Sequence, residues 1–129
     1  MFAPIRRNNG TKKILIVDDD RDLCEVLAGH VVNIFDDIQV ACCYDGGKAL
    51  QEINFGGFDC MVFDLQLPLV DGIELIRRTI SKPENEQAEI YVVSGNIDEN
   101  AQRSLDEMNI RGYIHKPFTF QDIYDMMRK

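Results

Sequence analysis

The chain has 129 residues, of which 45% are hydrophobic and 28% charged, which is typical of one soluble globular domain. Its 22 acidic and 14 basic residues give a formal net charge of −8, which argues against direct nucleic-acid binding and against an anionic membrane surface. No apolar run approaches the roughly 18–20 residues that span a bilayer, and residues 1–13 lack the apolar core of a secretory signal. We therefore expect a cytoplasmic protein without membrane association.

Cysteine spacing fits the same compartment. The four cysteines form no C-x-x-C pair, and three of them lie within apolar patterns: Cys24, Cys42, Cys43 and Cys60. The pattern predicts reduced, mostly buried thiols and no zinc site.

The chain divides into a polar start and one patterned domain. Residues 1–11 are polar and predict a flexible N-terminal tail, and residues 12–129 carry the domain. Five short apolar runs predict strands, at 14–17, 38–42, 60–63, 90–93 and 113–114. Their hydrophobicity is continuous rather than alternating, as expected of parallel strands buried on both faces.

Amphipathic stretches with helical spacing follow these runs. Asp20 is expected to cap the first helix, and Thr119 the last, with Asp122 at the capping-box position. The fourth helix, at about 97–108, differs because its apolar positions form one narrow seam: Ile97, Ala101, Leu105 and Met108. After the third strand, Pro68 is expected to end regular structure until the next helix.

Five successive βα units predict a parallel sheet with helices on both faces. The expected fold is a flavodoxin-like (βα)5 three-layer sandwich with strand order 2-1-3-4-5. In such a sheet, sites form outside the carboxyl ends of the strands, where the order reverses between the first and third strands.

Polar side chains follow four of the five predicted strands: Asp18 and Asp19 after the first, Asp64 after the third, Ser94 after the fourth and Lys116 after the fifth. Two carboxylates about 4 Å apart repel by roughly 4 kcal/mol at an effective dielectric constant near 20. A bound Mg²⁺ would offset this repulsion, as would a proton shared among the acids, and the sequence leaves both open. Acids, a hydroxyl, a lysine and a metal suit phosphoryl transfer to a carboxylate, which yields an acyl phosphate.

Four motifs in this order resemble the receiver domain of response regulators, of the CheY-like kind. "ILIVDDD" resembles the first strand and acidic pair, and "MVFDLQLPLVDG" the phosphoacceptor segment. "VVSGN" resembles the hydroxyl segment and "YIHKPF" the lysine-proline segment, so that the resemblance covers residues 12–129.

The resemblance implies a phosphorelay function and assigns the reacting residues. Asp64 would accept a phosphoryl group from a sensor histidine kinase or a histidine phosphotransfer protein, and Ser94 and Lys116 would contact its oxygens. Tyr113 would be an aromatic switch that turns inward when Ser94 moves. The chain would not be an enzyme but a regulatory domain that assists its own phosphorylation and dephosphorylation.

The resemblance also implies a metal ion and partner proteins. Asp18, Asp19, Asp64 and the backbone carbonyl of Gln66 would hold Mg²⁺, or Mn²⁺ in its place. The surface formed by the fourth and fifth strands and helices would control a downstream protein target or a missing C-terminal output domain. A homodimer through the last two helices is left open.

Two other functions compete with phosphorelay. The first is a receiver-like protein-binding module that works without phosphorylation. The second is a phosphohydrolase with an Asp-x-Asp nucleophile motif, but Asp64-Leu65-Gln66 lacks the second acid and 129 residues leave no room for a cap domain.

Overall fold

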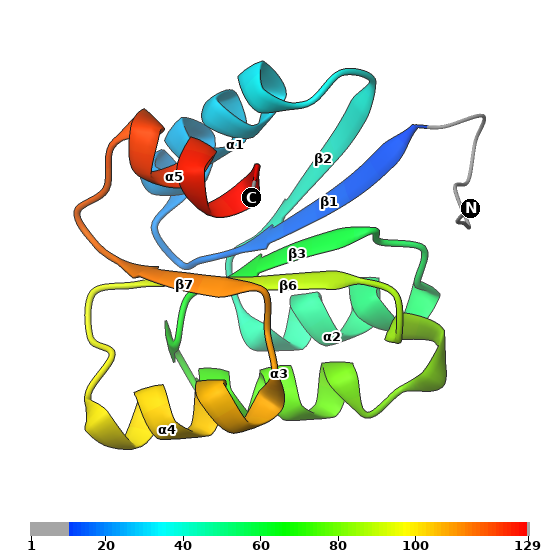
Figure 1. Cartoon of the computed structure of the whole chain (residues 1–129). Helices are drawn as coiled ribbons and strands as arrows, with labels where there is room; N and C mark the ends of the chain where they lie inside the picture. The colour runs from blue at the N-terminus through cyan, green and yellow to red at the C-terminus, as the bar shows by residue number, and fades with distance from the viewer. Residues whose placement is uncertain (1–10, 129) are drawn as a thin grey trace.

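A computed structural model of the chain describes residues 11–128 (Figure 1). Of the expected N-terminal tail, residues 1–10 lie outside the described residues. Among those described, no helix is long and apolar enough to cross a membrane. The four thiols are free, with Cys24, Cys43 and Cys60 buried and Cys42 half-buried, as their apolar surroundings predicted.

The core of the fold is a five-stranded parallel sheet. Its strands run in the order β2-β1-β3-β6-β7, which confirms the predicted topology, because β6 and β7 are the fourth and fifth predicted strands. The bounds are β1 Lys12–Val17, β2 Ile38–Cys43, β3 Cys60–Phe63, β6 Glu89–Ser94 and β7 Gly112–His115.

Helices cover both faces of the sheet, as predicted. Figure 1 shows α1 and α5 on one face and α2, α3 and α4 on the other. Alternate residues of β1 contribute side chains to two separate hydrophobic cores. Ile14 packs on the side of α1 and α5, and Leu15 packs on the opposite side. The bounds are α1 Arg21–Ile34, α2 Gly46–Phe55, α3 Gly72–Ile80, the 3₁₀ turn η2 Pro83–Asn85, α4 Glu99–Met108 and α5 Phe120–Met127.

Polar side chains cap the helices at the carboxyl edge of the sheet. Asp20 accepts a hydrogen bond from the Leu23 amide at 3.2 Å, as predicted. Thr119 and Asp122 form the expected capping box, because each side chain accepts a bond from the other residue's backbone amide.

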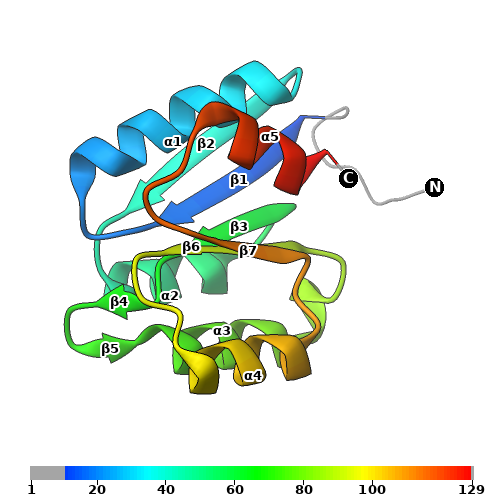
Figure 2. The same ribbon diagram turned by 60° about the vertical axis from the view of Figure 1, so that its left-hand side comes forward.

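The segment after β3 differs from the prediction that Pro68 ends regular structure. Two short strands, β4 (Gln66–Leu67) and β5 (Val70–Asp71), pair antiparallel and form a small hairpin (Figure 2). Leu69 completes the turn with a φ of 68°, in the left-handed region. Strands of two residues are too short to show a hydrophobic alternation, so the sequence pattern did not predict this hairpin.

Helix α4 is held by little apolar contact, as its narrow seam predicted. Leu105 is the helix's one fully buried side chain, and Ala101 and Met108 are half-buried against the same core. The helix begins at Glu99 with Asp98 as its cap, slightly later than expected. An element with so few buried contacts shifts at low cost in free energy.

Gly72 fixes the path of the chain between the hairpin and α3. A Cβ at this position would lie 2.4 Å from the Leu65 Cα. Because the nearest atoms all belong to the backbone of Leu65, the clash could be relieved only by moving the main chain. We expect Gly72→Ala to lower the free energy of unfolding by about 3 kcal/mol, measured by urea denaturation. As a control, Gly29→Ala in α1 meets nothing within 4 Å and should raise stability by about 0.5–1 kcal/mol. An unchanged stability of Gly72→Ala would contradict this account.

Candidate functional site

The carboxyl ends of four strands bring the predicted site residues together. Asp18 directly follows β1, Asp64 follows β3, Ser94 ends β6 and Lys116 follows β7. Because β1 and β3 are neighbours at the centre of the sheet, Asp18 and Asp64 lie side by side where the strand order reverses.

Asp64 is held in place by three hydrogen-bond donors. Its Oδ1 accepts bonds from the Ser94 hydroxyl at 2.8 Å and from the Gln66 amide at 3.0 Å. Its Oδ2 accepts a bond from the Lys116 ammonium at 3.0 Å. The side chain is almost fully buried, so these contacts fix both carboxylate oxygens in one orientation.

Lys116 bridges the two buried acids. Its Nζ lies 2.8 Å from Asp18 Oδ2 and 3.0 Å from Asp64 Oδ2. Its backbone amide donates to the Ser94 carbonyl at 2.9 Å, which anchors the lysine to the end of β6. Burial alone would lower the pKa of Lys116, but the hydrogen bonds to the two acids outweigh burial and raise it. The side chain therefore remains a cation at neutral pH.

The pKa of Asp18 is raised although Lys116 lies beside it. Burial raises its pKa, and the neighbouring charge of Asp64 raises it further. The bonds from Lys116 and from the Asp20 amide, at 3.0 Å, act in the opposite direction without cancelling burial. The ionised form of Asp18 is thus held in the fold at a cost in free energy.

The donor set suits a hard divalent cation. Carboxylate oxygens of Asp18, Asp19 and Asp64 all lie within 4.8 Å of one another, and Asp19 is exposed to solvent. Carboxylates with access to water are the ligands that Mg²⁺ and Mn²⁺ favour, and the pKa of Asp18 stays raised even with Lys116 beside it. These residues therefore fit the predicted metal, while the carbonyl of Gln66 as a further ligand stays a prediction.

Tyr113 lies beside the site rather than in it. It pairs with Val92 in the β6–β7 register, and Ser94 pairs with His115, so the tyrosine lies two residue pairs before the end of β6. The ring is half-buried, and its hydroxyl donates to Asp106 Oδ1 on α4 at 3.3 Å. Ser94 itself is completely buried.

Sequence reasoning missed three contacts of this site. It did not foresee the amide of Gln66 as a donor to Asp64, nor Asp106 as the partner of Tyr113. It also missed the Cys24 thiol, which donates to the Asp18 carbonyl at 3.3 Å. The buried face of the first helix was visible in the sequence, but its contact with the loop after β1 was not.

A parallel sheet of this order, with acids, a hydroxyl and a lysine at its strand ends, is the framework of a receiver domain. Residues 14–128 match the family model described as "Response regulator receiver domain". The chain belongs to this family, and it is a receiver domain of two-component signalling.

Relatives and solved structures agree with the family. The chain is 28% identical over 120 residues to chemotaxis protein CheY of Pseudomonas aeruginosa, covering 91% of this chain and 94% of that protein. It is 26% identical over 116 residues to transcriptional regulatory protein CutR of Streptomyces coelicolor, covering 90% of this chain and 52% of CutR. The chain thus spans about half the length of CutR.

Among solved structures, a CheY-like receiver domain protein from Methanospirillum hungatei superposes with a TM-score of 0.81 at 24% identity, covering 92% of this chain and 91% of that one. CheY4 of Vibrio cholerae gives a TM-score of 0.80 at 18% identity, covering 92% and 97%. These likenesses support the fold.

The raised pKa of Asp18 makes a prediction about stability. In metal-free solution at neutral pH, we expect Asp18→Asn to raise the free energy of unfolding by about 1–2 kcal/mol. Burial disfavours the ionised form of Asp18 and the charge of Asp64 repels it, and these costs exceed what is lost when the bond to Lys116 is weakened. As pH falls through the raised pKa, wild-type Asp18 takes up a proton, so the gain should shrink. Urea denaturation at several pH values measures the stability difference between the variant and wild type. A difference that grows at lower pH would contradict the assignment to the charge of Asp18.

Proposed function

We propose that Asp64 accepts a phosphoryl group from a phosphohistidine and thereby switches the surface formed by β6, α4, β7 and α5. The donor is a sensor histidine kinase or a histidine phosphotransfer protein. The observation that carries this proposal is the set of hydrogen bonds to Asp64. Its two carboxylate oxygens accept bonds from the Ser94 hydroxyl and the Lys116 ammonium, and Asp18 and Asp19 lie beside it.

In the transfer, an oxygen of Asp64 forms a bond to phosphorus while the phosphorus–nitrogen bond of the donor histidine breaks. The electron pair of that bond stays on the imidazole, which takes up a proton from solvent, and Asp64 becomes an acyl phosphate. Lys116 and Ser94 already lie at hydrogen-bond distance from the reacting carboxylate. They need only small movements to donate to the transferred phosphoryl oxygens, where negative charge accumulates.

Asp18, Asp19, Asp64 and the Gln66 carbonyl would hold the metal in this proposal. Mg²⁺ or Mn²⁺, when bound, supplies positive charge next to the phosphoryl oxygens. The chain's own contribution is to keep Asp18 ionised beside Asp64 and Lys116 cationic between them. The domain modifies only itself, so it assists its own phosphorylation and dephosphorylation and is not an enzyme with a separate substrate.

The switch begins at Ser94. Its hydroxyl donates to Asp64 Oδ1 in the unmodified protein, and we expect it to move toward the phosphoryl group after transfer. Tyr113, two residue pairs away, then turns inward, and the lightly packed helix α4 follows.

The partners follow from the same role. The chain receives phosphate in the cytoplasm from a histidine-phosphorylated protein and acts on a protein target or on an output domain. CutR is described as a transcriptional regulatory protein and is about twice as long as the matched segment, which supports an output domain as one arrangement. A sensor histidine kinase of Ectopseudomonas mendocina, TmoS, contains a matching segment, at 28% identity over 111 residues and 11% of its length.

Phosphorylation of Asp64 is directly testable. Incubation with acetyl phosphate and Mg²⁺ should add one phosphoryl group that is labile to base, detected by intact mass. Asp64→Asn should remove the adduct, and chelation of Mg²⁺ by EDTA should prevent it. Asp45→Asn is a matched control, because Asp45 caps α2 at the same edge of the sheet but follows the outer strand β2. An adduct that persists in Asp64→Asn would refute the assignment, and no adduct at all would favour a phosphorylation-independent binding module.

The proposed switch predicts where the protein changes. With beryllium trifluoride as a phosphoryl mimic, amide hydrogen exchange should change mainly within residues 94–115, which include α4 and β7. Mass spectrometry of peptides from wild type and Asp64→Asn, each with and without the mimic, measures this. Changes confined to segments far from residues 94–115 would count against the switch.

A further inference from the structure

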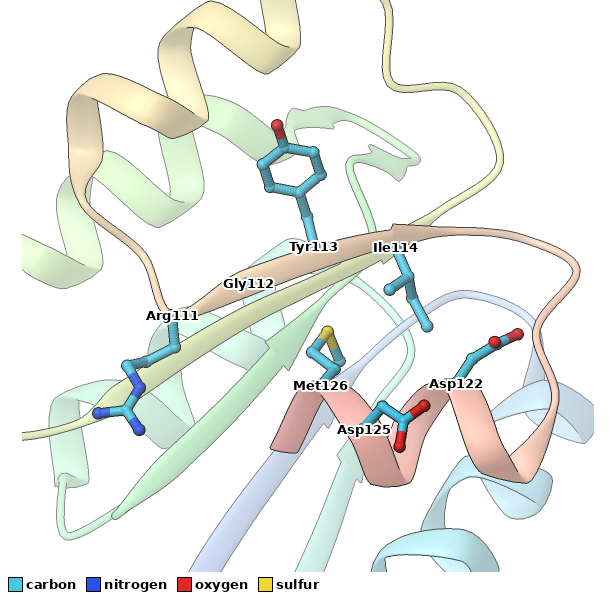
Figure 3. Close-up of a pocket in the computed structure, with 7 residues that line it drawn as sticks. All are labelled: Arg111, Gly112, Tyr113, Ile114, Asp122, Asp125 and Met126. Carbon is cyan, nitrogen blue, oxygen red and sulfur yellow. The ribbon is translucent and has the colours of Figure 1, made fainter. Parts of the chain in front are cut away.

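The contact between Tyr113 and Asp106 ties the last strand of the sheet to helix α4. Tyr113 points from β7 away from α5, on the opposite side of the strand from Met126 (Figure 3). Its hydroxyl reaches the Asp106 carboxylate at 3.3 Å, across a loop that separates the two residues by seven positions. The bond therefore joins two elements of the proposed switch surface.

This bond acts on a helix that has few other attachments. Leu105 is the fully buried side chain of α4, and Asp106 beside it is exposed. Hydrogen bonds to a charged acceptor contribute more than neutral ones, although a separation of 3.3 Å indicates a bond toward the weak end of that range. On such a lightly packed helix, even a weak bond is a sizeable part of what fixes its position.

We propose that Asp106 is a positioning residue: its carboxylate holds the Tyr113 ring in the outward orientation and so opposes the switch until Asp64 is phosphorylated. This inference rests on the proposed function and extends it to the regulation of the same site. The inward turn of Tyr113 has to break the bond to Asp106, so the bond adds to the free-energy cost of the switched state.

Thermodynamic linkage turns this proposal into a measurable affinity. A ligand that prefers the switched state binds more tightly when that state becomes less costly, by the same factor. We expect Asp106→Ala to bind beryllium trifluoride with Mg²⁺ about two- to fivefold more tightly than wild type, the range expected for loss of one weak hydrogen bond. Calorimetric titration, or the tyrosine fluorescence of a chain with 4 Tyr and no Trp, measures the affinity.

Three variants separate positioning from a general charge effect. Glu107→Ala removes the same charge from the adjacent exposed position of α4, and its affinity should match wild type. Asp106→Asn keeps an oxygen acceptor and should lie between wild type and Asp106→Ala. In a Tyr113→Phe background, which lacks the hydroxyl, Asp106→Ala should give no further gain. An equal gain from Glu107→Ala, or a full gain in the Tyr113→Phe background, would overturn the proposal.

A measurement without the mimic keeps this test independent of phosphorylation. Asp106→Ala alone should speed amide exchange in α4, and Glu107→Ala should not. Equal exchange in both variants would overturn the positioning role even if Asp64 is phosphorylated normally. Faster exchange in Asp106→Ala without any binding of the mimic by wild type would instead support the contact and refute the proposed phosphoacceptor function.

Discussion

The contact on which the site depends is the Lys116 ammonium lying between Asp18 and Asp64, at 2.8 and 3.0 Å from their oxygens. Two nearly buried carboxylates on neighbouring strands repel each other strongly, because little water screens them. The lysine arrives from β7, two strands away from β3, and its backbone amide is bonded to the end of β6. Lys116 thus connects the ends of β1 and β3 to the ends of β6 and β7.

Lys116 does not fully offset the cost of burying the negative charge of Asp18, and this remaining cost bears on the proposed metal site. Asp18 keeps a raised pKa although Lys116 and the Asp20 amide both favour its charge. A domain optimised only for stability would replace one acid by a neutral side chain of similar shape. The fold instead retains a region of excess negative charge next to an exposed carboxylate, Asp19, where a divalent cation fits. A divalent cation bound there, as proposed, would offset the repulsion between these carboxylates.

Most of the fold and the members of the site could be predicted because both follow from simple constraints. Continuous apolar runs predict parallel strands, and parallel strands place their carboxyl ends at one edge, so Asp18, Asp64, Ser94 and Lys116 had to converge. What could not be predicted depends on local conformation. The β4–β5 hairpin arises from a turn in which Leu69 adopts a left-handed φ, an unusual choice for leucine. The bond between Tyr113 and Asp106 depends on one side-chain rotamer, which no hydrophobic period encodes.

The arrangement of β6 and α4 shows how a change of one hydroxyl can reach a surface. In the unmodified protein Ser94 is held in place, since it is fully buried and its carbonyl and hydroxyl both bond to site residues. Only residues 95–98 separate it from α4, whose attachment rests on Leu105 and on weaker contacts. If the Ser94 hydroxyl moves after phosphoryl transfer, as proposed, the tightly packed strand β6 can adjust little, so the displacement would fall mainly on the lightly packed helix α4. Tyr113 is bonded to Asp106 on this helix, so in the proposed switch that bond would influence how readily α4 moves.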